Sequence, residues 1–322
     1  MVKFGIMGAG KIAHKFAKAI LGINEYLYAI ASRDLGRAQE FASIYELEKA
    51  YGSYAEMLAD PNVHCVYIAT PMSEHYANML QCLEAGKHVL CEKSFTINHK
   101  QAEHVLQIAK SKGLFVMEAM WTRFLPTIQE VQRIIQEGVI GDIVQIEAFI
   151  NLKLDAPLES RIYSKDLGGG ALLDVGVYPI HLANLLLGIP DSFDSEVQFA
   201  KTGVDANEKI TYLYPHNSAT LYASVINDDK KEAYIYGTKG YIHIPGFWYT
   251  ESATVFNNHH KVIRVIEHKH IVNGFEYEIF ETVRCIKKRL IESPLMTHAT
   301  TIEIMRQMDE IRKSWDLVYP QD

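Results

Sequence analysis

A glycine-rich turn near the N-terminus is the first group of residues whose types and spacing point to chemistry. Residues 8–13 match the pattern G-x-G-x-x-A, between an apolar segment, KFGIM, and a helical one. Gly8 permits a tight turn, and Gly10 lets the backbone approach a pyrophosphate. Free N–H groups at the start of the helix favour a phosphate. The pattern predicts a dinucleotide site, rather than a merely structural turn, formed by Gly8, Gly10, Lys11 and Ile12.

The end of the next apolar segment, YLYAIAS, bears on the choice of cofactor. An acidic side chain there accepts hydrogen bonds from the ribose 2′-OH of NAD, whereas this chain has Ser32 and Arg33. A guanidinium pairs with a 2′-phosphate through charge-assisted hydrogen bonds, and a serine adds a neutral one. Arg37 adds a second positive charge, which Asp34 partly offsets. We therefore expect NADP; the alternative for Arg33 is a solvated charge at a helix start.

Two further apolar segments, HCVYIAT and HVLCE, end on polar residues. Thr70 ends the first and is followed by Pro71 and His75, and Glu92 ends the second and is followed by Lys93. Because the carboxyl ends of parallel strands face the ligand crevice, we expect all five residues beside the cofactor. The Lys93 ammonium can bind a substrate oxygen and stabilise a nearby anion. The alternatives are a helix-surface histidine at 75 and an ion pair between Lys93 and Glu92.

A polar stripe lies in the segment GGGALLDVGVYPIH, residues 168–181. Asp174, Tyr178 and His181 recur at i, i+4 and i+7, on one face of an otherwise apolar helix. The three glycines allow close approach of the backbone. Two interpretations fit this spacing equally: a buried hydrogen-bonded network that holds domains together, or catalytic side chains directed at the nicotinamide.

The segments that must position these residues divide the chain in two. Residues 1–121 alternate short apolar runs with amphipathic stretches, the pattern of βαβ units, so we expect a doubly wound parallel Rossmann sheet that binds NADP. The strands expected are KFGIM, YLYAIAS, HCVYIAT, HVLCE and LFVMEA. One connecting helix is expected over 121–141.

Residues 122–322 predict an α+β domain for substrate binding and dimerisation. Strand-like runs dominate the stretch between Asp142 and about Glu267, so we expect an open, mostly antiparallel sheet with one helical insert after Gly168. In SATLYASVIN and EAYIYG both alternating sets of residues are largely apolar or aromatic, which indicates helices on one face and a partner subunit on the other. Two final helices, near 274–292 and 297–315, are free to pack back on the first domain.

Composition excludes several classes of function. The net charge of −7 and a pI near 6.1 argue against nucleic-acid binding, which needs clustered cations. The four cysteines show no metal-ligand spacing, so we expect reduced core residues and no metal. The N-terminus reaches Gly8 too early for a signal peptide, and no run of 18 apolar residues follows, which predicts a cytoplasmic protein without membrane association.

At these residues the chain resembles the Gfo/Idh/MocA oxidoreductases along essentially its whole length. The resemblance rests on GIMGAGKIA, CEKS, DVGVY and the final PLMTHATTIEIMRQMDEIRKS segment. Within the family, EAMWTRFLP and GGALLDVGVY are similar to the branch of dimeric dihydrodiol dehydrogenases and NADP-dependent xylose dehydrogenases. The resemblance implies a Rossmann domain followed by an α+β domain whose open sheet forms a homodimer.

The resemblance also implies residue roles. Lys93 matches the family's catalytic lysine, Tyr178 its His or Tyr acid/base, and Asp174 the aspartate four residues before it. Trp121, Arg123 and Phe124 would line the nicotinamide and substrate end. The family's Glu-Lys-Pro has Ser94 in place of proline here. Because a non-proline cis peptide costs about 3 to 4 kcal/mol, a trans bond or a displaced Lys93 is expected.

We therefore expect hydride transfer between nicotinamide C4 and a hydroxyl or carbonyl carbon, with Tyr178 moving the proton and Lys93 polarising the oxygen. An aldose and a trans-dihydrodiol both fit one lysine, one tyrosine and an aromatic wall. The alternatives from other classes are a non-catalytic NADP-binding redox sensor, which has no need of Lys93 and Tyr178, and a zinc dehydrogenase, which needs ligands the cysteines do not supply.

Overall fold

The computed structural model describes residues 1–322, which fall into two units by their contacts. Unit 1 comprises Met1–Met120 and Ile271–Met305, and unit 2 comprises Trp121–His270 and Arg306–Asp322. The sequence analysis placed the boundary after residue 121 and all later residues in the second domain, with the final helices free to pack back on the first. In the structure, Ile271–Met305 groups with unit 1.

The short apolar segments of unit 1 form a six-stranded parallel sheet of order β3-β2-β1-β4-β5-β6. Their central residues are buried because helices cover both faces, which explains the nearly continuous apolar runs. The doubly wound Rossmann fold is thereby confirmed, although the short β3 was not predicted. The strands are β1 (Lys3–Met7), β2 (Tyr26–Ala31), β3 (Lys49–Tyr51), β4 (Cys65–Ile68), β5 (His88–Glu92) and β6 (Val116–Ala119).

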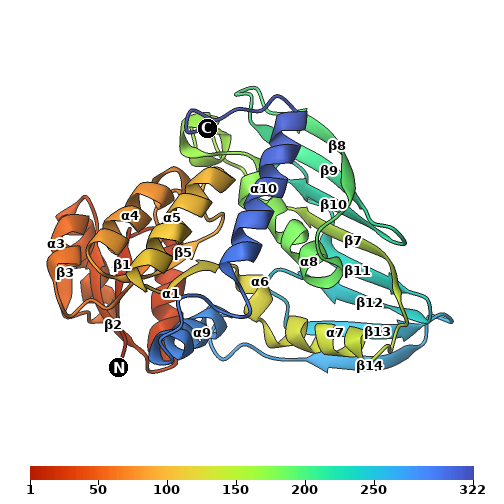
Figure 1. Ribbon diagram of the computed structural model, residues 1–322, viewed down its shortest axis with the longest axis horizontal. Helices are drawn as coiled ribbons and strands as arrows, with labels where there is room; N and C mark the ends of the chain where they lie inside the picture. The colour runs from red at the N-terminus through yellow and green to blue at the C-terminus, as the bar shows by residue number, and fades with distance from the viewer. The chain divides into compact units, whose positions relative to one another are not determined.

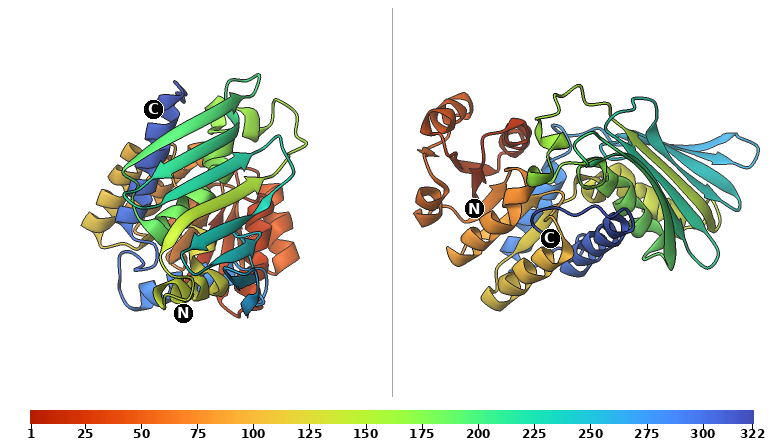
Figure 2. Two further views of the ribbon diagram at one scale, coloured as in Figure 1. Left: turned by 90° about the vertical axis from the view of Figure 1, so that its right-hand side faces the viewer. Right: turned by 90° about the horizontal axis from the view of Figure 1, so that it is seen from above.

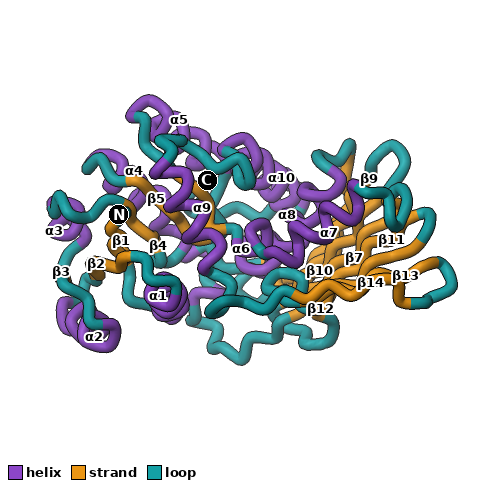
Figure 3. Tube along the Cα trace, turned by 90° about the horizontal axis from the view of Figure 1, so that it is seen from below, coloured by secondary structure: helices purple, strands orange, loops and turns teal.

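The helices of unit 1 lie on both sides of this sheet. Figure 3 shows α1 and α2 on one side of the strands and α4 and α5 on the other. Phe16 of α1 stacks on Tyr67 of β4 with ring centroids 3.7 Å apart, and α9 packs against α1. The helices are α1 (Lys11–Gly22), α2 (Leu35–Tyr45), α3 (Tyr54–Ala59), α4 (His75–Glu84), α5 (His99–Lys112) and α9 (Glu276–Lys287). The last helix, α10 (His298–Ser314), begins in unit 1 and ends in unit 2.

Unit 2 is built on an eight-stranded sheet of order β14-β13-β12-β11-β7-β10-β9-β8. Only β7 and β10 pair in parallel, so the predicted mostly antiparallel sheet is confirmed. The sequence analysis did not name β8, β13 or β14. The strands are β7 (Ile143–Asn151), β8 (Ser192–Phe199), β9 (Asp205–Leu213), β10 (Ser218–Ser224), β11 (Lys231–Gly237), β12 (Gly240–Pro245), β13 (Ser252–Asn257) and β14 (Val262–Glu267).

Residue alternation gives the two faces of this sheet different characters. Every second residue of the central strands is fully buried, including Ile146, Ile235 and Ile242. α8 (Val177–Leu187) packs on this face over β7 and β10, and α7 (Pro126–Gln136) packs on β13 and β14 (Figure 1). No helix lies in front of the other face (Figure 2, left). We call this second surface the outer face.

The helix expected over 121–141 is wrong as a single element. The structure has α6 (Trp121–Phe124) and then α7, separated by Leu125, because Pro126 takes the first position of α7, where its missing N–H costs nothing.

After the glycines at 168–170, a π-helical turn (Leu172–Gly176) leads into α8. The stretch Lys165–Leu187 is long and apolar enough to cross a membrane, but 72 % of its apolar part is buried inside the protein, as in a core helix.

His75 joins the loops that follow β4 and β5. Its side chain is 1 % exposed, with Nδ1 3.0 Å from the carbonyl oxygen of Ser94 and Nε2 3.0 Å from that of Thr70. The alternative of a helix-surface histidine is therefore wrong, because the first turn of α4 faces the sheet. Burial lowers the pKa of His75 to about 4, so the ring is neutral at neutral pH.

We expect His75 to make the protein less stable in mild acid. The unfolded chain binds this proton near pH 6.5 and the folded protein only near pH 4, so the stabilisation present above about pH 6.5 falls as the pH approaches 4, by up to about 3 kcal/mol. In His75→Gln the free energy of unfolding, measured by urea unfolding between about pH 6.5 and pH 4, should depend less on pH than in the wild type. The exposed His216→Gln is the control; an equal slope in wild type and His75→Gln would contradict the assignment.

Candidate active site

The glycine turn of unit 1 has the geometry of a phosphate cradle. Gly8 has a φ of +99°, which favours glycine, and its N–H donates to the Ala31 carbonyl at 2.9 Å. Gly10 precedes α1, whose first turn has neither a side-chain cap nor an acidic residue. A Cβ placed on Gly10 would approach only the Ala69 carbonyl oxygen, at 4.0 Å. The first N–H groups of α1 therefore have no side-chain cap, and the backbone at Gly10 leaves room for the approach of a pyrophosphate.

Arginines and their neighbours follow β2, beside this turn. Ser32 is 7 % exposed, and its hydroxyl accepts the N–H of Asp34 at 3.3 Å. Asp34 caps α2 by accepting the N–H of Arg37 at 3.2 Å. The guanidinium of Arg37 donates to the carbonyl oxygen of Ala9 at 3.1 Å, whereas Arg33 is exposed. The only carboxylate at the start of α2 is thus engaged as a helix cap, while Arg37 lies against the glycine turn and Arg33 is exposed at the end of β2.

Tyr54 is a residue of this region that the sequence analysis missed. Burial raises the pKa of its phenol, whereas the positive charges of Arg33 and Arg37 lower it. The phenol therefore lies within the field of both arginines. Its place at the start of α3, directly after the capping residue Ser53, was the available sequence signal.

The polar residues predicted after β4 and β5 lie at adjacent strand ends, since β4 and β5 are neighbours. Thr70 accepts a hydrogen bond on its hydroxyl from the Asn78 amide at 2.9 Å, and Pro71 leads into the short helical turn before α4. The Lys93–Ser94 peptide bond is cis, so the expected trans bond is wrong. Ser94 is fully buried, and its carbonyl oxygen lies against the His75 ring.

A buried acidic cluster lies next to Lys93. Tyr67 donates a short hydrogen bond to the carboxylate of Glu92, and both side chains are buried. Burial raises the pKa of Glu92, while the Tyr67 hydrogen bond and the Lys93 charge lower it. Glu278 of α9 is fully buried near Glu92, and burial together with that charge raises its pKa well above the usual value. Glu278 therefore holds a proton beside Glu92, a neighbour that sequence spacing did not indicate.

In unit 2, Asp174 and Tyr178 lie on the π-helical turn and the first turn of α8. Asp174 accepts a hydrogen bond from the Arg161 guanidinium at 3.0 Å and is 14 % exposed at its side chain. Tyr178 is 8 % exposed and His181 is fully buried. Burial lowers the pKa of His181 well below its usual value, and the charge of Arg123 lowers it further. The stripe thus runs from a partly accessible ion pair to a neutral core histidine.

The short helix α6 brings two predicted residues to this region, because it packs against α8. Arg123 is 9 % exposed, and Trp121 is partly exposed with its ring centroid 6.3 Å from that of Tyr249. Trp248 meets Tyr249 edge-on at 5.0 Å. Trp121, Trp248 and Tyr249 therefore form an aromatic cluster, of which the sequence analysis identified only the first.

No group of three or more His, Cys, Asp or Glu side chains is arranged to hold a metal ion. The four cysteines are free and buried, as expected for reduced core residues.

Comparisons with known proteins match both halves of the chain. Residues 2–120 match a model described as the oxidoreductase family GFO/IDH/MocA with an NAD-binding Rossmann fold, and residues 128–243 match the C-terminal domain of that family. Trans-1,2-dihydrobenzene-1,2-diol dehydrogenase of Mus musculus is 33% identical over 333 residues, covering 100% of this chain and 99% of the relative. The Xenopus laevis enzyme of the same name is 32% identical over 99% of both chains.

Solved structures share this architecture. The 3-ketoreductase KijD10 of Actinomadura kijaniata, in complex with NADP and TDP-benzene, superimposes with a TM-score of 0.88 and 25% identity over 97% of both chains. Aldose-aldose oxidoreductase of Caulobacter crescentus gives a TM-score of 0.88 at 19% identity over 97% of both chains, a likeness of fold. The glycine turn, the lysine after β5 and the tyrosine of α8 thus lie in a chain that belongs to the GFO/IDH/MocA oxidoreductase family.

Proposed function

We propose that this protein is an NADP-dependent oxidoreductase that acts on a CH–OH group or the corresponding carbonyl. The observation that carries the proposal is the uncapped N-terminus of α1 behind Gly8 and Gly10, with Arg37 bonded to the same turn. Unpaired helix N–H groups and a positive dipole end suit a pyrophosphate. The relatives named as dehydrogenases over the full chain support the reaction class.

The groups after β2 support NADP over NAD. A ribose 2′-phosphate needs cations, and both Arg33 and Arg37 supply them, while the carboxylate between them, Asp34, is directed to the start of α2 as its cap. Ser32 adds a hydroxyl at the same strand end. The KijD10 ketoreductase was crystallised with NADP, which is consistent with this choice.

The bound nicotinamide would supply or accept a hydride at C4. Lys93 polarises the substrate oxygen with its ammonium, and Tyr178 moves the proton of that hydroxyl. Asp174, held by Arg161 at 3.0 Å, lies four residues before Tyr178 and places a negative charge near the start of α8. Thr70, Pro71 and Glu92 would hold the cofactor at the ends of β4 and β5, with Trp121 and Arg123 at its nicotinamide end.

A trans-dihydrodiol or an aldose is the proposed substrate. The aromatic cluster of Trp121, Trp248 and Tyr249 suits a small ring with adjacent hydroxyl groups, because aromatic faces pack against both unsaturated rings and sugar faces. The names of the relatives, a dihydrodiol dehydrogenase and an aldose-aldose oxidoreductase, place these two classes first for testing.

Removing the phenol of Tyr178 should stop turnover while leaving the cofactor in place. Tyr178→Phe should lower kcat by about 100-fold or more, because the proton loses its carrier, with the affinity for NADP nearly unchanged. Turnover is followed at the nicotinamide absorbance with trans-1,2-dihydrobenzene-1,2-diol and a panel of aldoses. Tyr214→Phe in the same unit, whose hydroxyl donates to the Gly188 carbonyl, is the control. Wild-type turnover in Tyr178→Phe would remove this residue from the mechanism, and NADP binding with no turnover of any substrate would favour the redox sensor.

Removing Arg33 should erode the preference for NADP. Arg33→Ala should weaken NADP binding by about 10-fold to 100-fold, the value of charge-assisted hydrogen bonds, and leave NAD affinity unchanged. Fluorescence titration of both nucleotides measures the ratio. Lys18→Ala, which removes an exposed cation from α1, controls for net charge. Equal affinity of the wild type for NAD and NADP would refute the assignment.

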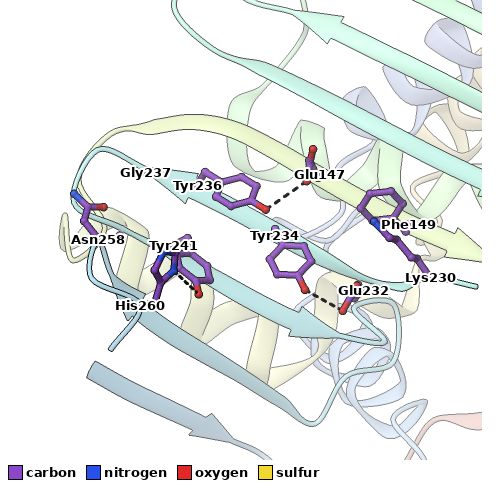
Figure 4. Close-up of a pocket in the computed structure, with 11 residues that line it drawn as sticks. Glu147, Phe149, Lys230, Glu232, Tyr234, Tyr236, Gly237, Tyr241, Asn258 and His260 are labelled. Carbon is purple, nitrogen blue, oxygen red and sulfur yellow. Dashed lines mark hydrogen bonds between the residues drawn. The ribbon is translucent and has the colours of Figure 1, made fainter. Parts of the chain in front are cut away.

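We also propose that the outer face of unit 2 forms a homodimer with a second copy of this chain. Figure 4 shows side chains of β7, β11 and β12 rising together from this face. Tyr234 stacks on His243 at 4.7 Å and on Tyr236 at 5.9 Å, and Tyr241 stacks on Phe256 at 4.7 Å. These rings are only partly buried in one copy, so a continuous aromatic ladder meets solvent unless a partner covers it.

The charges of the same face suit a copy of itself. Lys230 lies over the ring of Phe149 at 4.4 Å, while Glu232 accepts from His243 at 2.8 Å and Glu147 accepts from Tyr236 at 3.4 Å. Both signs are thus present on one surface, as a twofold, self-complementary interface requires. A nucleic acid or an anionic surface would need an excess of cations instead.

Light scattering after size-exclusion chromatography tests this interface. The wild type should elute as a dimer, and Tyr236→Asp should weaken the dimer by about 30-fold or more, because it buries an unpaired charge. Lys201→Asp, in the exposed turn between β8 and β9, should stay dimeric. A monomeric wild type, or an intact Tyr236→Asp dimer, would overturn the proposal.

A further inference from the structure

Two carboxyl groups of β9 are buried behind the π-helical turn of unit 2. Asp205 is fully buried and Glu208 is 2 % exposed. Burial raises the pKa of both groups, and the charge of Asp205 raises the pKa of Glu208 further. Glu208 therefore keeps its proton at neutral pH and can donate it to the neighbouring Asp205. A buried acid pair of this kind is costly for a fold unless the remaining oxygens have partners.

Asp205 finds its partner at the start of the helix that carries Tyr178. The backbone N–H of Leu172 donates to Asp205 Oδ2 at 2.6 Å across 33 positions of sequence. Ala171 also bonds the carboxylate through its N–H, and no neighbouring side chain caps this helix end. The positive end of the helix stabilises an anion there, so Asp205 carries the charge and Glu208 the proton.

Two glycines, Gly170 at the end of the GGG run and Gly176 six residues later, provide the space for this pair. A Cβ on Gly170 would collide with the carboxylate of Asp205, and a Cβ on Gly176 would collide with Glu208 Oε1. The close backbone approach expected from the sequence is thus an approach to two carboxyl groups of the same unit. Gly170 precedes the π-helical turn, and Gly176 is its last residue.

The C-terminal tail completes the contact. The Tyr319 hydroxyl donates to the carbonyl oxygen of Gly169 at 2.6 Å, and the ring is 1 % exposed. Arg312 fixes the tail by bonding Asp322 at 2.8 Å, with its guanidinium 4.9 Å from the Tyr319 ring. The segment before Asp174 is therefore held from β9 and from the tail.

We propose that Asp205 and Glu208 are positioning residues, which set the π-helical turn and thereby the placement of Asp174 and Tyr178. The pair contacts the first and last residues of the turn, and Asp174 lies between those contacts. Tyr178 follows two residues after the second contact. This inference rests on the proposed role of Tyr178, but the geometry of the turn can be measured without any substrate.

The alternative is a purely structural pair. Apolar replacements of a buried polar pair are often neutral or stabilising, so melting temperature alone does not separate the two roles. The neutral carboxamide of Glu208→Gln can still donate to Asp205, whereas the nearly isosteric Glu208→Leu cannot. A positioning role predicts rescue by glutamine and loss with leucine.

The test uses the full-length protein in four forms: Asp205→Leu, Glu208→Leu, Glu208→Gln and the control Asp194→Asn, an exposed carboxylate on neighbouring β8. Hydrogen exchange should accelerate about tenfold or more at residues 171–178 in both leucine variants, because a cap or its donor is lost, and stay unchanged in β1 and β4. With NADP and trans-1,2-dihydrobenzene-1,2-diol, kcat should fall by about tenfold or more in the leucine variants, while KM for NADP stays within about twofold. Glu208→Gln and Asp194→Asn should stay within about threefold of the wild type.

Wild-type exchange at 171–178 in both leucine variants would overturn the proposal, whatever the activity. Equal losses of kcat in Glu208→Gln and Glu208→Leu would also overturn it, because the proton of Glu208 would then be irrelevant. Faster exchange with wild-type kcat would show that the turn moves without consequence for the reaction, which refutes the positioning role. If Tyr178→Phe is fully active but hydrogen exchange in the leucine variants responds as expected, the proposed function fails. The inference that Asp205 and Glu208 hold the π-helical turn in place then still stands.

Discussion

The first N–H groups of a helix have no partner inside that helix, and the two units meet this requirement in opposite ways. In unit 1 the start of α1 has no side-chain cap, so its donors remain for a phosphate. In unit 2 the corresponding donors of Ala171 and Leu172 are taken by Asp205 from a distant strand. One helix end is left open to bind, and the other is closed to hold a helix in place.

Glycines lie at both helix starts, and each unit contains a pair of buried acids. Gly10 leaves room for a ligand, whereas Gly170 and Gly176 leave room for carboxyl groups of the protein itself. Each unit also keeps a protonated acid next to a charged one, namely Glu278 beside Glu92 and Glu208 beside Asp205. Burying one charge rather than two limits the desolvation cost while preserving a directed negative charge.

The sequence predicted most of the fold because parallel strands covered on both faces are continuous apolar runs. It missed β3, which has three residues, and β8 and β14, which lie at the sheet edges with most side chains exposed. The placement of Arg33, Thr70 and Lys93 just after strands was readable from the sequence. The hydrogen-bond partners of buried polar groups were not readable from the sequence. Pairs such as Arg161 with Asp174 and Asp205 with Leu172 arise only from tertiary packing.

The route of the chain through the two units has a consequence for synthesis. Helix α9 belongs to unit 1, where it packs against α1 and contributes the buried Ile279 and Val283, yet it follows the 150 residues from 121 to 270 that form unit 2. On the ribosome the first 120 residues therefore emerge with one face of α1 uncovered, and this core closes only after nearly the whole chain has been made. During that interval the nascent Rossmann sheet presents this apolar face to other chains, because the helix that covers it is made after unit 2.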